Sequence, residues 1–415
     1  MAQKTDWDSL YLEAGKVFTP ASPVSEESLF AGRTEQLHKI IDAVNQRGQH
    51  AIVFGERGVG KTSLSFIIAT KLRRPNAELL TPRINCDSAD TFASVWRKVF
   101  SEIDLIRDRP AMGFQMTIFQ ESTKAADVLP NPCGPDDIRR LLTILSDSAV
   151  VIVVLDEFDR IGDEKTKRAM ADTIKVLSDN AVPATLVLVG VADSVDSLIS
   201  EHQSIERALV QVVMPRMSQT ELRQIIEKGA ARLGMSADDD ASHAIAVLSQ
   251  GLPHYTHMIG LHACRAAIDC RQLRVTLAQV DFAISKAVES AQHSIKSAYL
   301  KATTSHQADN IYSHVLLACA LAKTDPLGYF IAADVREPLS SIMGRSYDIP
   351  GYNKHLKQFC EVQRGCVLTK RGDQWKRRYR FGNPLMQPYI VMQGLVDKKI
   401  DRRTVEQETF YNQPD

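Results

Sequence analysis

Residues 55–62 read GERGVGKT, a spacing that suits the binding of phosphate groups. Glycines in such a turn let consecutive backbone N–H groups point toward one anion. A β-branched run at 50–55 precedes the motif and a helical pattern follows it, so the amides would lie at a helix N-terminus. The pattern G-x-x-x-x-G-K-[ST], carried by Gly55, Gly60, Lys61 and Thr62, therefore predicts a loop that holds the phosphates of a nucleotide.

Each polar side chain of this motif has a predicted role. Lys61 is expected to reach the β and γ phosphates of ATP, and the Thr62 hydroxyl is expected to hold Mg²⁺. The other nucleotide contacts predicted in the loop are Gly58, Val59 and Ser63. The alternative is an incidental glycine-rich turn, which the strand–loop–helix context argues against.

A second chemical signal is the apolar run at 150–157, VVIVVLDE, which predicts a buried strand ending in two carboxylates. Asp156 is expected beside the metal, and Glu157 is expected to act as the general base that polarises the attacking water. The alternative is a pair of solvated acids at the sheet edge. Asp159 in the same DEFDR run could assist Mg²⁺ or simply begin a helix.

The elements that must position these residues alternate between β-branched runs and helical patterns as far as Pro215. The predicted strands are 50–55, 81–86, 149–155, 184–190 and 209–213. Such alternation is typical of a parallel sheet with helices on both faces. The predicted fold class is α/β, with a five-stranded parallel sheet in a P-loop domain at 30–215.

After Pro215 the strand patterns stop, and residues 216–295 predict a small helical domain. Ser218 and Glu221 have the spacing of a capping box at the start of its first helix. Three more helical stretches are expected, at 238–249, 253–269 and 276–292.

Residues 300–395 predict a third domain. Helical patterns at 306–322, 331–343 and 352–363 precede a stretch that alternates around Arg371-Gly372-Asp373, as in a β-hairpin. Three helices followed by a hairpin predict a winged helix. The remaining segments are an extended arm at 1–29, with room for one short helix, and a loose tail at 396–415.

Bulk composition excludes some classes of protein and leaves others open. The 415 residues carry 50 Lys+Arg against 50 Asp+Glu, so net charge argues neither for nor against nucleic acid. Seven scattered Cys without a C-x-x-C pair indicate a reducing compartment and no zinc site. The polar N-terminus and the short apolar runs predict a cytoplasmic protein without a membrane partner.

Several segments resemble, in order, the successive motifs of AAA+ and STAND ATPases. They are LFAGRTEQL at 29–37, the P-loop, LDEFDRI at 155–161, LVGVADSV at 188–195 and SIERAL at 204–209. The resemblance covers roughly residues 20–290 and is nearest to origin-recognition initiator ATPases, transposition-regulator ATPases and bacterial STAND NTPases. It implies an ATPase that forms ADP and phosphate, with a helical lid after the sheet.

The resemblance also assigns roles to single residues. It places Arg33 near the adenine, with Phe30 and Val24 packing on the base, although Arg33 could equally be a surface residue. Asp193 falls on the position that senses the γ phosphate, where many relatives have Asn or Thr. Arg207 falls where such families place an arginine finger that reaches the γ phosphate of a neighbouring subunit, which implies a homo-oligomer; the alternative is a helix-surface Arg paired with Glu206 or Glu201.

GLPHY at 251–255 occupies the place where many AAA+ proteins begin the helix with a second sensor Arg. Pro253 and His254 stand there instead, which is similar to the G-x-P motif of STAND switches. His254 is expected either to contact nucleotide or to serve as a capping or core residue.

The hairpin of the third domain is basic, with Trp375 and Tyr379 interleaved. Its cationic residues are Lys370, Arg371, Lys376, Arg377, Arg378 and Arg380. A wing of this kind can follow a phosphate backbone, which makes DNA the predicted partner. The alternatives are a solvated hairpin or a face that binds protein.

Two functions follow from these predictions. One is an ATP-dependent switch acting on DNA, and the other is a STAND-type signalling or defence ATPase that controls an effector protein. The segment 107–135 is a long insertion, either a loop for a partner or DNA or a peripheral subdomain on the sheet.

Overall fold

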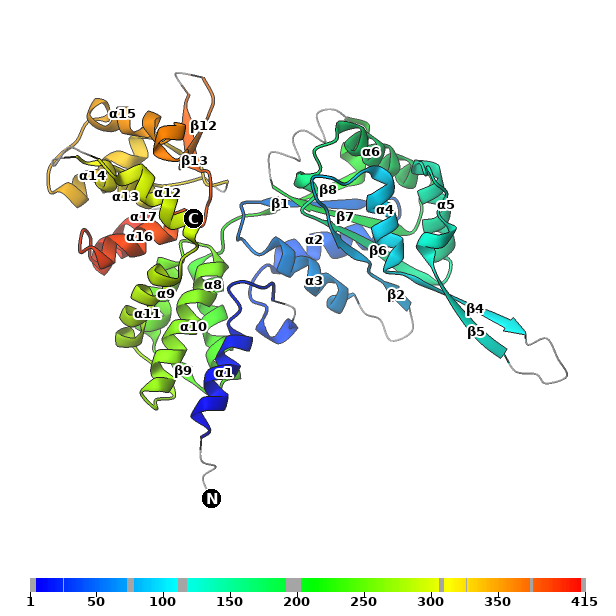
Figure 1. The fold of residues 1–415 in the computed structure, drawn as a ribbon, viewed down its shortest axis with the longest axis horizontal. Helices are drawn as coiled ribbons and strands as arrows, with labels where there is room; N and C mark the ends of the chain where they lie inside the picture. Colours follow the sequence, from blue (N-terminus) through cyan, green and yellow to red (C-terminus); the bar gives the residue numbers. More distant parts are fainter. Residues whose placement is uncertain are drawn as a thin grey trace. The chain divides into compact units, whose positions relative to one another are not determined.

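The computed structural model describes residues 5–24, 26–72, 78–110, 118–191, 203–305, 310–325, 327–373 and 376–411. Its contacts divide the chain into two compact units, drawn in Figure 1. The α/β unit consists of Arg33–Gly55 and Lys61–Met214. The helical unit consists of Met1–Gly32, Glu56–Gly60 and Pro215–Asp415. The finer division into separate lid and C-terminal domains stays a prediction.

The α/β unit is built on a sheet in which every pairing is parallel, as predicted. Its described strands are β1 (His50–Gly55), β2 (Glu78–Leu80), β3 (Arg83–Asn85), β6 (Ala149–Asp156), β7 (Ala184–Gly190) and β8 (Leu209–Met214). The order is β2-β6-β7-β1-β8, and β3 also pairs with β6.

The described part of this sheet has six strands where the sequence predicted five. Two short strands share one edge position, because β2 lies beside 149–151 of β6 and β3 lies beside 154–156. Pro82 falls between them and has no N–H to continue the ladder. The strand expected at 81–86 corresponds to β3, and β2 is an additional strand that the sequence did not predict.

Helices cover both faces of this sheet, with α4, α5 and α6 on one side and α2 and α3 on the other (Figure 1). They are α2 (Thr34–Asn45), α3 (Lys61–Lys71), α4 (Phe92–Ser101), α5 (Pro135–Ser146) and α6 (Glu164–Asp179). The unit also contains three 3₁₀ turns, η2 (Ala125–Val128), η3 (Phe158–Arg160) and η4 (Gln203–Ala208). On α4, Trp96 and Phe100 are fully buried and their rings stack at 5.6 Å.

The predicted insertion at 107–135 begins earlier, at Asp104, and its described residues include an antiparallel hairpin. Strands β4 (Asp104–Pro110) and β5 (Ile118–Lys124) pair only with each other among the described residues. The ribbon extends away from the sheet of its unit in Figure 1. This part of the insertion is therefore not a subdomain packed on the sheet.

The first part of the helical unit contains the helices that the sequence predicted. They are α8 (Gln219–Arg232), α9 (Asp239–Leu248), α10 (Pro253–Asp269) and α11 (Leu277–Ser290). The capping box of Ser218 and Glu221 is confirmed. The short strands β9 (Ser236–Ala237) and β10 (Arg274–Val275) pair beside these helices.

The N-terminal arm is helical over α1 (Trp7–Val17), with a 3₁₀ turn η1 at Glu27–Leu29. Phe18, directly after α1, is buried between α8 and α10. A Cβ at Gly229 would lie 2.4 Å from its ring, and one at Gly260 would lie 2.9 Å from it. These two glycines make the slot that anchors the arm.

The rest of the helical unit joins the same hydrophobic core. Its helices are α12 (His293–Thr303), α13 (Tyr312–Leu321), α14 (Arg336–Met343), α15 (Ile349–Gln358), α16 (Met386–Val396) and α17 (Arg402–Tyr411). Two 3₁₀ turns, η5 (Ala332–Val335) and η6 (Val362–Arg364), lie among them. Strands β11 (Phe330–Ile331), β12 (Leu368–Arg371) and β13 (Arg378–Phe381) form an antiparallel sheet in the order β11-β13-β12. The predicted hairpin is confirmed.

The expectation of a loose tail at 396–415 requires correction. Asp401 accepts hydrogen bonds from the backbone N–H and the hydroxyl of Thr404, which fixes the start of α17. Val405 is then only 1 % exposed in the core. A single buried side chain in a charged sequence is a weak signal, which is why the helix was missed.

No helix among the described residues is long and apolar enough to cross a membrane.

Candidate functional site

The loop between β1 and α3 has the backbone that its glycines predict. Gly58 and Gly60 have φ of 84° and 94°, in the left-handed region. At Gly55, the last residue of β1, a Cβ would lie 2.3 Å from the Met214 carbonyl oxygen, so only glycine fits. A turn of this kind at the head of α3 forms a cradle for an anion.

Lys61, the first residue of α3, folds back over this loop. Its Nζ donates a hydrogen bond to the Gly55 carbonyl oxygen at 3.0 Å. Thr62 and Ser63 follow in the first turn of the helix, half-buried, and Val59 is 1 % exposed. The loop is thus closed by the residue that the sequence predicts as a phosphate ligand.

Asp156 ends β6 as predicted, and its carboxylate is already engaged. One oxygen accepts from the Glu157 backbone N–H at 2.9 Å, and the other lies 2.6 Å from Nη2 of Arg83 on β3. The Asp156 side chain is only 4 % exposed. A buried carboxylate needs such compensation, and Arg83 supplies it.

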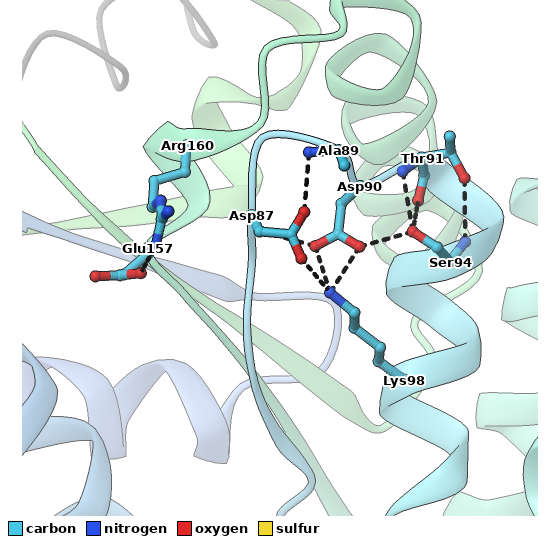
Figure 2. A network of polar contacts seen from close by, with 8 residues as sticks. All are labelled: Asp87, Ala89, Asp90, Thr91, Ser94, Lys98, Glu157 and Arg160. Atoms are coloured by element: carbon cyan, nitrogen blue, oxygen red, sulfur yellow. Dashed lines mark hydrogen bonds and ion pairs between the residues drawn. The ribbon is translucent and has the colours of Figure 1, made fainter.

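Glu157, the predicted general base, has a left-handed backbone with φ of 54°. Residues other than glycine adopt this region at an energetic cost, and such residues cluster at functional sites. Its carboxylate pairs with Nη1 of Arg160 at 2.8 Å (Figure 2), and both side chains are exposed. Asp159 instead accepts a hydrogen bond from the Val191 backbone N–H at 3.2 Å, a link to the end of β7.

An acidic cluster follows β3 on the loop that leads to α4. Figure 2 shows Lys98 reaching from α4 to Asp87 and Asp90, at 2.8 and 2.7 Å. Asp90 is 3 % exposed and also accepts from the Asp87 backbone N–H and the Ser94 hydroxyl. The Lys98 ammonium holds the pKa of the Asp87 carboxyl below its usual range. These contacts tie the loop after β3 to α4, and the Cys86 N–H donates to the Asp156 carbonyl oxygen at 2.8 Å.

Within the helical unit, loop residue Glu56 forms a buried ion pair. Its carboxylate accepts from Nε and Nη2 of Arg216 at 2.6 and 3.2 Å. The third guanidinium nitrogen donates to the Gln250 carbonyl oxygen at 3.2 Å. Arg216 therefore joins the loop to the turn that carries Gly251 and Pro253.

Three further segments of the helical unit lie against the same loop. A Cβ at Gly60 would meet Pro253 at 3.8 Å, a Cβ at Gly58 would lie 2.9 Å from Leu385, and one at Gly328 would lie 2.0 Å from the Glu56 carboxylate. Leu385 is held in turn, because its carbonyl oxygen accepts from the Tyr255 hydroxyl at 2.6 Å. Pro253, which the sequence places in a G-x-P motif, thus lies near Gly60 of the phosphate loop.

His254, predicted either to contact nucleotide or to pack, is bonded to the N-terminal arm. Its Nδ1 lies 2.7 Å from the Pro20 carbonyl oxygen, and since a carbonyl only accepts, Nδ1 carries the proton. Burial lowers the pKa of His254, although the Pro20 carbonyl opposes the shift. The neutral ring therefore keeps Nε2 as an acceptor, and a phosphate contact would require a second proton.

Two further residues predicted for the site, Arg33 and Arg207, lie in the α/β unit. Arg33, the N-cap of α2, is left-handed with φ of 61° and 4 % exposed, so it is not a surface residue. Arg207 in η4 is exposed, and its backbone carbonyl accepts from Gln49. Among the described residues it makes no ion pair with Glu206. Asp193 lies outside the described residues.

The basic hairpin presents arginines on one outer face. Tyr379 and Phe381 of β13 point into the core, so Arg378 and Arg380 point outward, and Arg371 of β12 lies directly opposite Arg378. The other predicted cations, Lys370, Lys376 and Arg377, lie along the same hairpin.

Two of these arginines also make contacts inside the unit. The guanidinium groups of Arg378 and Arg380 lie 5.4 and 4.8 Å from the centroid of the Tyr329 ring, and Arg378 is 3.3 Å from Asp325. These contacts orient the side chains, and their partial exposure leaves the charges accessible. Trp375 lies outside the described residues.

Sequence reasoning missed Arg83, Arg160 and Arg216. Arg160 stands three residues after Glu157, a spacing that could have indicated the pair. Arg83 and Arg216 lie 73 and 160 residues from the carboxylates that they bind. No local signal in the sequence reports those pairs.

Comparisons with known proteins agree with this architecture. A model of the family described as Novel STAND NTPase 1 matches residues 22–254. No curated protein gives a significant match.

Similar folds occur among solved structures. A Walker-type ATPase of Pyrococcus abyssi is 14 % identical, with 90 % of this chain and 99 % of that chain covered and a TM-score of 0.51. The ORC2 protein of Aeropyrum pernix is 14 % identical, with 95 % of this chain and 98 % of that chain covered and a TM-score of 0.49. The ORC1 protein of Aeropyrum pernix, solved in complex with DNA, is 14 % identical, with 92 % of this chain and 97 % of that chain covered and a TM-score of 0.46. At these identities the likeness concerns the fold alone.

Proposed function

This chain belongs to the family described as Novel STAND NTPase 1, and on that premise we propose that it is a switch that binds and hydrolyses ATP and acts on DNA. The observation that carries the nucleotide part is the loop before α3. Gly58 and Gly60 are left-handed there, and Lys61 opens the helix. Backbone amides turned in this way bind phosphate groups.

Mg²⁺ fits the residues that are present. The Thr62 hydroxyl and the Asp156 carboxylate are the oxygen ligands that Mg²⁺ prefers, and the carboxylate already takes a cationic partner in Arg83. Bound there, Mg²⁺ would neutralise charge on the phosphates. Lys61 would exchange the Gly55 carbonyl for a phosphate oxygen, and the other loop contacts would be Val59 and Ser63.

Glu157 is the proposed general base. Its strained backbone supports that role, and its ion pair with Arg160 is exposed, so opening the pair costs little. The freed carboxylate would accept a proton from the attacking water. Asp193 remains the proposed sensor of the γ phosphate, and Arg33 the proposed adenine contact.

The switch is proposed to work through the helical unit. Residues 56–60 of the phosphate loop contact Arg216, Pro253 and Leu385 within that unit. A change in the loop conformation on ATP binding would therefore alter the contacts of all three residues. His254 is proposed to join the site after protonation or loss of the Pro20 contact. Arg207 is proposed to act in a homo-oligomer, as a finger toward a neighbouring subunit.

The DNA-binding part is proposed to be a winged helix. The order α13, β11, α14, α15, β12, β13 supports this architecture. Arg371 stands directly opposite Arg378, so cationic side chains lie together on one face of the hairpin. A face of this kind supports contact with a phosphate backbone.

The test is DNA binding by fluorescence anisotropy, with ADP and with a non-hydrolysable ATP analogue. Wild type is compared with Arg377→Glu/Arg378→Glu and with the control Arg47→Glu/Lys175→Glu, which changes the same charge at exposed positions of the α/β unit. ATP-dependent binding that only the hairpin variant loses supports the proposal. Equal binding by all three proteins, or none in either nucleotide state, refutes the DNA role.

An alternative is a STAND-type signalling or defence ATPase that controls an effector protein. It is favoured by Pro253 and His254 in the G-x-P position and by the contacts that Arg378 and Arg380 already make with Tyr329. In that case the same ATP-dependent change would appear, for example as faster proteolysis of the helical unit, without any affinity for DNA.

A further inference from the structure

Arg83 has no role in the motifs of the sequence, yet it binds the carboxylate that is proposed to hold Mg²⁺. It lies on β3, opposite Val154 of β6. The register continues with Ile84 opposite Leu155 and then Asn85 opposite Asp156. Side chains two residues apart share one face of a sheet, so Arg83 and Asp156 lie on the same face. Their atoms Nη2 and Oδ2 are 2.6 Å apart.

The environment of Arg83 also places it beside the helix that carries the phosphate ligands. Its guanidinium carbon lies 3.9 Å from the centroid of the Phe66 ring on α3. α3 begins with Lys61, whose Nζ still bonds to Gly55. The side chain is 18 % exposed, so its charge is largely withdrawn from water.

The geometry of the Arg83–Asp156 pair differs from that of a permanent buried ion pair. Arg216 grips Glu56 with two nitrogens, Nε and Nη2, the fork geometry that is strongest for Arg and carboxylate. Arg83 uses only Nη2, and its Nε is buried without a hydrogen-bond partner among the described residues. A buried donor without a partner makes the closed pair less favourable. The Arg83–Asp156 ion pair should therefore open more easily than the Arg216–Glu56 ion pair.

We propose that Arg83 is the resident counter-ion of Asp156 before nucleotide binds, and that Arg83 must release this carboxylate before the carboxylate can take Mg²⁺. Arg83 thereby sets the Mg²⁺ concentration at which nucleotide is bound. The inference rests on the proposed ATP site at Lys61, Thr62 and Asp156. It predicts that removing the charge of Arg83 lowers the Mg²⁺ requirement, because the carboxylate then has no competing cation.

The experiment is an equilibrium titration of MgCl₂ at a fixed concentration of a fluorescent ADP analogue, read by anisotropy. For Arg83→Gln the half-saturating Mg²⁺ concentration is expected to fall by about fivefold or more, because one cation that competes with Mg²⁺ for a buried carboxylate is lost. Arg97→Gln on α4 removes an exposed charge of the same type and is expected to stay within about twofold of wild type. Thermal melts without nucleotide show whether each variant folds.

Arg83→Lys provides a second route if Arg83→Gln does not fold. The ammonium keeps the charge but has neither the planar donor set nor the stacking on Phe66, so a smaller shift in the same direction is expected. An unchanged or higher Mg²⁺ requirement in a folded Arg83 variant that binds nucleotide overturns this inference alone. No nucleotide binding by wild type at any Mg²⁺ concentration overturns the proposed ATP site and this inference with it.

Discussion

Replacing Arg371 by Glu separates the stability of the β12–β13 hairpin from its charge. In the antiparallel register Arg371 lies directly opposite Arg378, where two like charges oppose pairing. Arg371→Glu turns this into an opposite-charge pair, worth about 0.2–1 kcal/mol on a sheet surface. The melting temperature of the helical unit should therefore stay the same or rise by up to about 4 °C.

DNA binding should change in the opposite direction. If the outer-face arginines Arg371, Arg378 and Arg380 each neutralise one phosphate, the logarithm of the affinity falls with a slope of about −2.7 against the logarithm of salt. Between 50 and 200 mM salt wild type then loses about 40-fold in affinity, and a variant with two contacts loses only about 12-fold. Arg371→Glu should also bind more weakly at every salt concentration, because its carboxylate repels the backbone.

The assay is anisotropy of a labelled 30-base-pair duplex at several salt concentrations, alongside thermal melts. Lys175→Glu is the matched control, since it makes the same change in charge at an exposed position of α6 in the α/β unit. A variant as stable as wild type with unchanged affinity and salt slope would show that Arg371 does not touch phosphate. A clear loss of stability would instead contradict the expected gain from an opposite-charge pair across β12 and β13.

Lys61→Ala should abolish the stabilisation of the folded protein by nucleotide, which is about 2.7 kcal/mol at a ligand concentration of 100 times Kd. The readout is the shift in melting temperature, and a retained shift would contradict the role of Lys61 as a phosphate ligand. Glu157→Gln should still bind ATP but hydrolyse it about 10²- to 10⁴-fold more slowly in a phosphate-release assay, and wild-type turnover would exclude Glu157 as the base. Burial lowers the pKa of His50 to about 4, and its Nδ1 accepts from the Leu186 backbone N–H. As the pH falls, His50 therefore takes up a proton in the unfolded state before it does so in the folded state. The free energy of unfolding is unaffected by His50 above pH 6.5 and decreases as the pH falls from 6.5 through 4. This should amount to about 2 kcal/mol between pH 7 and 5 in urea denaturation, and His50→Asn should flatten the profile.

Local patterns in the sequence predicted the elements that carry the chemistry. The glycines of 55–62, the acids at the end of β6, the Ser218–Glu221 capping box and the β12–β13 hairpin each depend on residues within a few positions of one another. Hydrogen bonds of turns, caps and hairpins close over such short distances. Parallel pairing of the sheet also followed, because β-branched runs separated by helices leave few other arrangements.

Tertiary structure alone decided which charges meet. Arg83 reaches Asp156 only because β3 and β6 pair in one register, and Glu56 meets Arg216 across 160 residues of chain. The division of the sheet edge into β2 and β3, and the burial of Val405 that makes α17 a helix, have the same origin. A strand or a charged side chain selects its partner by position in the folded molecule, and that position is a property of the whole chain rather than of its neighbours in sequence.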